Sequence, residues 1–296
     1  MWDFDSIYAK AVEYFGRGGK HTKSDDAEFV IWNLLGLEFL LRLPLAKVHA
    51  SLLAVPDGTS ILHANGFIAA SNSTPQSIPV STVITRLQTI VEGFTKAHAD
   101  DASVLVGLRN AELHTGAPIA ENTTNDFWLP KLIRVADVIV EHLGIPLESF
   151  LTSAVIAEGR KLIDAQDKKL AHEVEERIRA ARAFLTKLNP AEIASRSSSP
   201  GPDGYSFVAT CPACAWKAWL RADQVRLTAE RFEEGQLTRD AVYVVTALQC
   251  KVCALTLETT AECVAAGVKQ QLVQQLEESL EDRLMLAYEE PDYGND

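Results

Sequence analysis

The sequence predicts a mainly α-helical chain that ends in a small β-rich module built around cysteines. Apolar residues recur at helical spacing through residues 1–190, and two Cys-x-x-Cys pairs then fall among short alternating segments. A chain of 296 residues has room for about two domains. We therefore expect an N-terminal all-α bundle over 1–190, a linker over 191–204, and a cysteine module with a C-terminal helix over 205–296.

The helical domain should be organised around one buried helix near its N-terminus. A first helix is expected over 4–15, where apolar side chains share one face and a glycine run follows. Residues 24–28, Ser-Asp-Asp-Ala-Glu, carry the signals of a helix start. The helix that follows is apolar on most sides, so it should lie at the centre of the bundle, and Pro44 should kink or end it.

The rest of this domain follows from apolar periodicity and turn residues. Residues 56–79 are rich in Gly, Ser, Asn and Pro, which predicts a long irregular connection with one turn of helix near Leu62. The segment 156–188 is dense in charge with a thin apolar stripe. We interpret it as the solvated face of a long helix, with a binding surface as the alternative. Further helices are expected over 81–94, 103–115 and 125–143.

Beyond residue 188 the composition becomes that of a linker and then of short strands. Residues 195–202 are rich in Ser, Pro and Gly, which marks the domain boundary. A helix is expected over 223–234. A final helix is expected over 268–288, where apolar residues recur at four-residue steps, at Val268, Leu272, Leu276, Leu280 and Leu284. Strands are expected over 205–210, 216–220, 241–248 and 254–259.

Four of the five cysteines form two pairs with the spacing of metal knuckles, Cys211 with Cys214 and Cys250 with Cys253. Each pair places two thiolates on one side of a tight turn, and two such turns close a tetrahedral Zn²⁺ site. Four protein ligands leave no open coordination position. We therefore expect a structural zinc in a zinc-ribbon-like module over 205–296, with disulfide pairs or a redox site as the alternatives. Cys263 is left over and should be buried.

The residues after the first knuckle combine aromatic and basic side chains, at Trp216, Lys217, Trp219 and Arg221. Such a surface can bind single-stranded nucleic acid. Strand alternation would instead place both tryptophans on one packed face, and we favour this packing interpretation.

Charge and hydropathy argue against several classes of function. The net charge of −12 argues against broad, non-specific duplex binding, because that requires a basic face. The N-terminus is acidic and lacks the layout of a secretory signal. The most apolar run, residues 29–48, is interrupted by polar residues and a proline, so a buried helix explains it better than a membrane span. We therefore expect a cytoplasmic protein with no membrane partner.

The candidate catalytic residues lie at the end of the helix predicted over 103–115: Arg109, Asn110 and His114. Asn110 and His114 share a helix face, while Arg109 and His114 point about 140° apart. The long arginine side chain can swing round to complete one polar pocket. A histidine moves protons near neutral pH, and a guanidinium stabilises charge on phosphate oxygens. This chemistry suits metal-independent RNA cleavage with the ribose 2′-hydroxyl as nucleophile.

A second Arg…His pair, Arg42 and His49, occurs in the same chain, but a leucine follows its arginine and a proline interrupts its helix. Arg109 and His114 are preferred because an asparagine follows the arginine and because the helix ends just after the histidine. The alternative is that Arg109 is an ion-pairing residue and His114 a helix cap. Glu38 can pair with Arg109 and orient it, or lie on the surface.

The apolar helical core over residues 27–53 resembles that of HEPN domains, the higher eukaryotes and prokaryotes nucleotide-binding family. The Arg109-Asn110-x-x-x-His114 element is similar to the Arg-polar-x-x-x-His motif of that family. The resemblance covers residues 4–150, about half the chain. It implies an all-α domain that dimerises so that two motifs meet in one composite cleft. It also implies metal-independent endoribonuclease activity, often in toxin–antitoxin or anti-phage systems.

One position departs from that family. In HEPN toxins paired with nucleotidyltransferase antitoxins, a tyrosine commonly follows the motif histidine after one residue. This chain has Gly116 there, so the resemblance does not extend to tyrosine-based regulation.

We therefore expect a homodimeric, metal-independent endoribonuclease with RNA as substrate and an antitoxin or regulatory protein as a further partner. His114 would act as general acid and base, Arg109 would stabilise the phosphate, and Asn110 would orient the site. The expected products are a 2′,3′-cyclic phosphate and a 5′-hydroxyl. One alternative is a non-catalytic dimeric adaptor with zinc as a structural staple. Another is a regulator that binds a nucleotide in the composite cleft without cleaving RNA.

Overall fold

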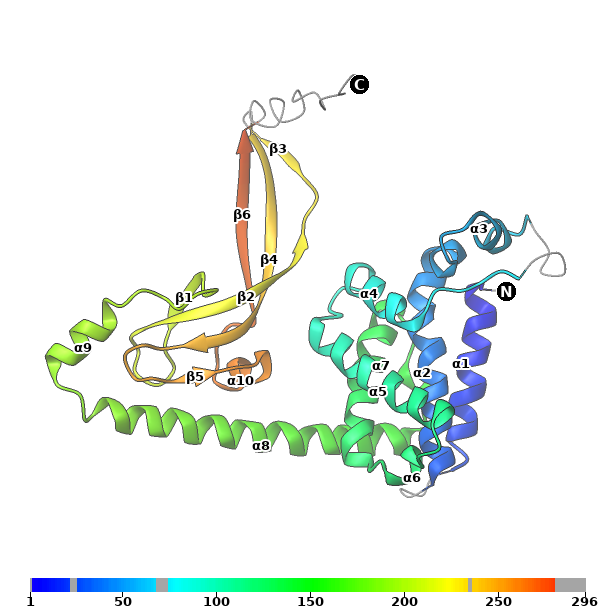
Figure 1. Cartoon of the computed structure of the whole chain (residues 1–296), viewed down its shortest axis with the longest axis horizontal. Coiled ribbons are helices and arrows are strands. Elements are labelled where there is room, and N and C mark those ends of the chain that lie inside the picture. The colour runs from blue at the N-terminus through cyan, green and yellow to red at the C-terminus, as the bar shows by residue number, and fades with distance from the viewer. Residues whose placement is uncertain (1, 22–25, 68–73, 234–235, 280–296) are drawn as a thin grey trace. The chain divides into compact units, whose positions relative to one another are not determined.

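The computed structural model describes residues 2–21, 26–67, 74–233 and 236–279. The chain divides into two compact units, Met1–Ala165 and Gln166–Asp296, which we call the helical unit and the cysteine unit (Figure 1). The boundary falls inside helix α8 (Ser153–Leu185), which contributes residues to both units. The linker predicted at 191–204 therefore lies within the cysteine unit.

The described part of the helical unit is all-α, and its central helix is the predicted one. Helix α2 packs against α1, α4, α5 and α7, and its apolar residues are buried on most sides. The Asp26 carboxylate caps α2 by accepting from the backbone N–H of Glu28, as the start signal predicts. Besides α8, the α-helices are α1 (Phe4–Gly18), α2 (Ala27–Val48), α3 (Gly58–Ala64), α4 (Val80–Ile90), α5 (Lys96–His114), α6 (Ile119–Asn122) and α7 (Asn125–Leu143).

Helix α2 does not end at Pro44 but continues to Val48, and a short 3-10 helix, Ala50–Leu53, follows it. By length and apolar composition alone α2 is able to cross a membrane. However, 67% of its most apolar window is buried inside the unit. Its packing is therefore that of the predicted core helix.

Helix α5 carries the candidate catalytic residues and runs between α2, α4 and α7. It begins at Lys96, earlier than predicted, because Thr95 and His98 form a capping box at its start. It ends at His114, within one residue of the predicted end. The contact between α5 and α2 brings the arginine of the motif beside the central helix.

The cysteine unit contains an antiparallel sheet around one long strand. The described strands have the order β1-β2-β4-β3, and β5 and β6 also pair with β4. Because β4 pairs with both β2 and β5, the turn before β2 and the turn after β4 lie at the same end of the sheet. The elements are α9 (Pro190–Ser197), β1 (Phe207–Thr210), β2 (Lys217–Leu227), β3 (Arg231–Glu233), β4 (Gln236–Gln249), β5 (Thr256–Leu257), α10 (Thr260–Ala265) and β6 (Gln271–Ser279).

Two helices predicted in this unit are wrong. The segment predicted as a helix over 223–234 instead extends β2 to Leu227 and then forms β3, and residues 271–279 form β6 against β4. The four-residue apolar step misled because four is also a multiple of the strand period. Leu272 and Leu276 therefore share a face in either structure, and pairing with β4 selects the strand. Residues 280–288 of the predicted C-terminal helix lie outside the described residues.

The predicted linker is structured. Helix α9 occupies part of it and begins with a capping box formed by Asn189 and Glu192. Farther along, Gly201 lies against the indole of Trp219, where a Cβ would come within 2.6 Å of an indole carbon. A side chain at this position would displace the tryptophan, so the contact requires glycine.

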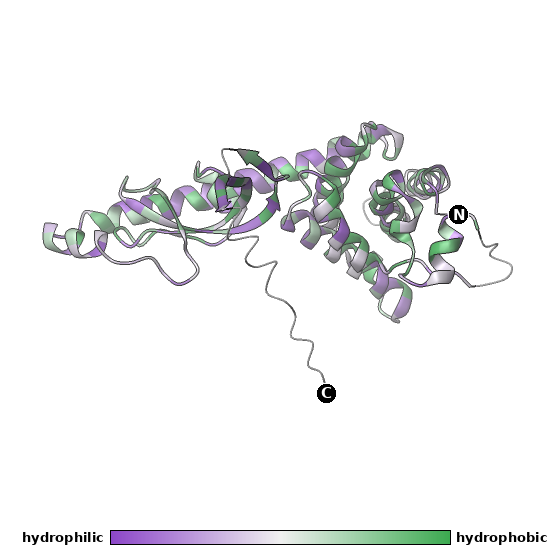
Figure 2. Ribbon diagram, turned by 90° about the horizontal axis from the view of Figure 1, so that it is seen from above, coloured by the Kyte–Doolittle hydropathy of each residue, from purple (hydrophilic) through white to green (hydrophobic). Residues whose placement is uncertain are grey.

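The charge-dense part of α8 also contributes to the cysteine unit. Hydrophilic and hydrophobic residues alternate along this helix (Figure 2), and most of its charged side chains are exposed, as predicted. Its thin apolar stripe is not solvated, because it packs on the core of the sheet. The residues of the stripe are Leu170, Val174, Ile178, Ala181 and Leu185.

Candidate functional site

The four knuckle cysteines come together at one end of the sheet, as predicted. Their sulfur atoms all lie within 4.8 Å of one another. The Cys211 and Cys253 sulfurs are 3.6 Å apart, and so are those of Cys214 and Cys250. A Zn–S bond of about 2.3 Å places the corners of a tetrahedron about 3.8 Å apart. The cluster can therefore hold a metal ion of the size of zinc.

Both knuckles have the same backbone geometry. The residue after each second cysteine is left-handed, with φ of 61° at Ala215 and 60° at Ala254. In each knuckle the N–H of the first cysteine donates to the carbonyl five residues later, from Cys211 over 2.8 Å and from Cys250 over 2.9 Å. The sequence thus builds two equivalent turns, each of which holds two sulfurs on one side.

Glycine in place of Ala254 should stabilise the metal-loaded protein by about 0.5–1 kcal/mol, because alanine is strained in the left-handed region and glycine is not. Denaturant unfolding of the loaded protein measures the change. Ala213→Gly is the control: that residue lies outside the left-handed region, so its replacement should lower stability. Equal losses in both variants would contradict the strain argument.

Without a cation, the four thiols of the cysteine cluster cannot all be ionised at once without a cost in free energy. Burial raises the pKa of the Cys214 thiol to about 12, and the neighbouring Cys211 raises that of Cys253 well above its usual range. A hydrogen bond from Cys211 lowers the pKa of Cys250 instead, so one thiolate is stabilised by its neighbours. A divalent cation supplies the charge that four thiolates at this spacing require.

Cys263 is fully buried, as predicted, and burial raises its thiol pKa to about 11. The aromatic and basic residues after the first knuckle were interpreted either as a packed face or as a surface for single-stranded nucleic acid, and the structure has some of them packed and some exposed. Trp219 packs against Gly201, with the Lys217 ammonium 4.5 Å from its ring, whereas Trp216 is 44% exposed. The two tryptophans therefore do not share one packed face.

Arg109 of α5 is ion-paired with the central helix. Its Nη2 lies 2.7 Å from the Oε2 of Glu38, whose other oxygen lies 3.2 Å from the Nη2 of Arg42. The side chains are only 14%, 20% and 11% exposed for Arg109, Glu38 and Arg42. Of the two positions that the sequence left open for Glu38, a pair with Arg109 or a place on the surface, the structure has the pair. Sequence reasoning missed Arg42 as the second partner, although its i, i+4 spacing from Glu38 on α2 was a signal.

Asn110 and His114 lie on the other side of α5. Both are exposed, and they continue a stripe of exposed residues that includes Ser103 and Gly107. Among the described residues of one chain, the structure brings Arg109 to Glu38 and does not bring it to His114. The five-residue spacing explains this, since it turns the two side chains about 140° apart.

Replacing Glu38 by alanine should lower the free energy of unfolding by about 2–3 kcal/mol, because two largely buried guanidinium groups would lose their shared carboxylate. Denaturant unfolding measures the loss. Glu13→Ala is the matched control: Glu13 also lies between two basic residues, Lys10 and Arg17, but on the exposed surface. The control should lose about 0.5 kcal/mol or less. Losses of equal size would show that burial of Glu38 and its two arginines adds nothing to the free energy of unfolding.

Comparison of the chain with protein-family models, with curated proteins and with solved structures found no match in any of the three.

Proposed function

We propose that the protein is a cytoplasmic, metal-independent endoribonuclease of HEPN type that acts as a homodimer. Support comes from α5: its histidine is exposed at the helix end, and its arginine is braced by Glu38 of α2. Arg42 and Arg109 carry two positive charges against one carboxylate. The surplus charge favours a phosphate group. By its resemblance, the enzyme would serve as a toxin or anti-phage effector with an antitoxin or regulator as partner.

In the proposed reaction His114 takes the proton from the ribose 2′-hydroxyl. The 2′-oxygen then bonds to phosphorus, the bond from phosphorus to the 5′-oxygen breaks, and that oxygen receives a proton from the histidine of the site. Arg109 stabilises the charge that develops on the phosphate oxygens, and Asn110 orients the site. Arg109 and His114 face different sides of one α5, so a single chain does not form the site, and the composite cleft of two copies is taken from the resemblance to HEPN dimers.

The cleavage assay uses the purified protein, total RNA and an excess of EDTA. We expect cleavage to persist in the chelator and to leave 2′,3′-cyclic phosphate and 5′-hydroxyl ends, which end-specific ligation distinguishes. Products with 5′-phosphate ends, or loss of cleavage in EDTA with recovery on adding Mg²⁺, would contradict a metal-independent mechanism.

The exposed stripe of α5 supports the dimer. Gly107 lies in the middle of this helix, where glycine costs about 1 kcal/mol relative to alanine. Apart from its chain neighbours and the backbone of its own helix, no atom of the described residues lies within 4 Å of the position that its Cβ would occupy. Within the described part of one chain nothing requires glycine at this position, whereas the close approach of a second α5 would.

Gly107→Arg should convert a dimer to a monomer and abolish RNA cleavage with it, because the side chain would separate the two helices. Light scattering after gel filtration measures the mass, and the cleavage assay measures activity. Gly16→Arg is the control: that glycine of α1 is equally exposed with open space around it, and its replacement should leave both properties unchanged. A wild-type monomer that cleaves RNA would contradict the composite cleft.

We also propose that the cysteine cluster holds a structural zinc ion. Four cysteine ligands close the tetrahedron and leave no position for substrate or water, so the ion has a structural role. One observation favours a second candidate function, a dimeric adaptor without catalysis. Arg109 is only 14% exposed and its Nη2 pairs with Glu38, as in a purely structural arginine, although its buried Nε has no hydrogen-bond partner among the described residues.

A further inference from the structure

Two arginines of the cysteine unit donate to the backbone of the two knuckles. Arg182 of α8 donates from Nε to the carbonyl of Ala213 over 3.1 Å and from Nη2 to that of Pro212 over 3.2 Å. Arg196 of α9 donates to the carbonyl of Lys251 over 3.3 Å. All three carbonyls lie between the two cysteines of a knuckle. Each knuckle is therefore held by one arginine from a different helix.

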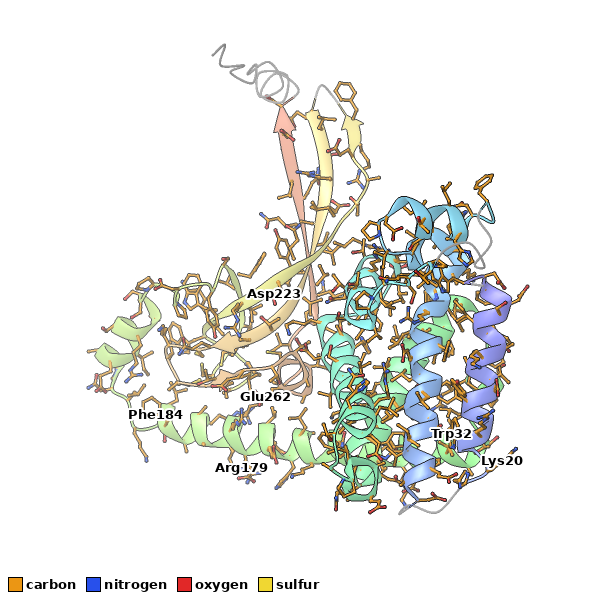
Figure 3. All side chains as sticks on the ribbon, turned by 45° about the vertical axis from the view of Figure 1, so that its right-hand side comes forward. Lys20, Trp32, Arg179, Phe184, Asp223 and Glu262 are labelled. Atoms are coloured by element: carbon orange, nitrogen blue, oxygen red, sulfur yellow. The ribbon has the colours of Figure 1, made fainter. Side chains whose placement is uncertain are left out.

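Unlike two other arginines of α8, Arg182 and Arg196 have no carboxylate partner among the described residues. Arg179 pairs with Glu176 over 2.8 Å, and Arg177 pairs over 3.0 Å with Glu262 of α10. Figure 3 labels Arg179 on α8 and Glu262 on α10. A zinc ion with four thiolates carries a net charge of −2. The two unpaired guanidinium groups beside the knuckles supply an equal positive charge.

The same contacts join the helices to the sheet. The apolar stripe of α8 packs on the core around the cysteines, and the Arg196 guanidinium lies 5.1 Å from the ring of Phe184 at the end of that helix. The fork of Arg182 reaches two successive carbonyls, so it fits only when the first knuckle keeps its shape. A bound metal fixes that shape, because it ties both cysteines of the knuckle to one point.

We propose that Arg182 and Arg196 are positioning residues for the metal, so that metal loading and the attachment of α8 and α9 to the knuckles form one coupled equilibrium. The inference rests on the proposed zinc site. Coupling is reciprocal: loss of the arginines weakens metal binding, and loss of the metal releases α9. Arginine suits the role better than lysine because its planar fork binds two acceptors at once.

The first experiment measures the Zn²⁺ affinity of the full chain, stripped of metal under reducing conditions, by competition with a chromophoric chelator. Arg182→Gln and Arg196→Gln should each weaken binding about tenfold, and the double variant about 100-fold. Arg182→Lys should recover part of the loss, because it keeps the charge without the fork. Arg179→Gln is the matched control on the same helix, where the side chain pairs only with nearby glutamates.

The second experiment follows hydrogen exchange in α9 of the wild-type chain with and without metal. Metal removal should raise exchange in α9, and the double variant should exchange fast in both states. Affinities of the arginine variants within twofold of the Arg179→Gln control would overturn the proposal. Unchanged hydrogen exchange in α9 of the wild-type chain on metal removal would also overturn the proposal. This result does not depend on whether the variants fold. If the wild-type chain binds no Zn²⁺, the zinc site itself fails instead.

Discussion

His114→Ala should slow RNA cleavage about 10²–10⁴-fold, because a positioned general acid and base contributes an acceleration of that size. His114 is the last residue of α5 and is exposed, so its replacement removes no packing contact from the core. Thermal unfolding of the variant should therefore match that of the wild type. Initial cleavage rates of a single labelled RNA, compared at equal protein concentration, measure the effect.

The chain supplies its own control in His49. This histidine follows Arg42 in the second Arg…His pair and is also exposed at a helix end, where its Nδ1 lies 2.8 Å from the Ser51 hydroxyl. His49→Ala should cleave at the wild-type rate. Equal activity in the His114 variant, the His49 variant and the wild type would point to a contaminating nuclease and remove the support for an enzyme.

Arg109→Ala separates the two functions proposed for this helix. The enzyme predicts a loss comparable to that of His114→Ala, since the charge on the phosphate oxygens would lose its stabilising partner. The adaptor predicts lower stability alone, because Glu38 would keep only Arg42 as partner. Arg109→Lys should retain the charge but lose the planar geometry, so it should stay folded with reduced cleavage.

The cysteine cluster could be predicted from the sequence because short-range spacing determines most of it. Two cysteines three positions apart fit one tight turn, and an antiparallel sheet with adjacent turns brings two such pairs together. The partners of the cluster could not be predicted in the same way. Arg182 and Arg196 come from helices more distant in the chain, and each resembles an ordinary surface arginine in sequence.

The central helix could also be predicted from the sequence, and the pairing of Glu38 with Arg109 was one of two alternatives that the sequence left open. A helix that is apolar on most sides has to be buried, and the acidic residue on it then needs a basic partner. The direction of the Arg109 side chain could not be predicted from the sequence. It depends on whether α2 lies on the arginine side or the histidine side of α5, and only tertiary packing decides that.

The segment over 268–288 shows where periodicity stops being informative. Its residues favour helices individually, and their apolar spacing fits a helix and a strand equally well. In the described part, β4 supplies backbone partners from Gln271 to Ser279, and this long-range pairing outweighs local preference. The four-residue apolar spacing therefore could not distinguish the predicted final helix from the strand that forms there.

Removal of the metal should unfold the cysteine unit. Its buried core includes Cys211, Cys250 and Cys253, with Cys214 packed against it, and is smaller than the core of the helical unit. Structural Zn²⁺ contributes about 10–16 kcal/mol to small modules of this type, which is as much as a whole domain commonly has in reserve. We therefore expect amides of β2 and β4 to exchange freely in chelator, while those of α2 in the helical unit stay protected.

Cys253→Ser should have the same effect without a chelator, because a serine hydroxyl is a poor substitute for a thiolate on zinc. Cys263→Ser is the matched control: this cysteine is equally buried in the same core but is not one of the four clustered sulfurs. It should keep the metal and the protection of the sheet. If β4 stays protected in the Cys253 variant, the sheet does not depend on the ion. If both variants lose the protection equally, the change in the buried core explains the loss and the metal ligand does not.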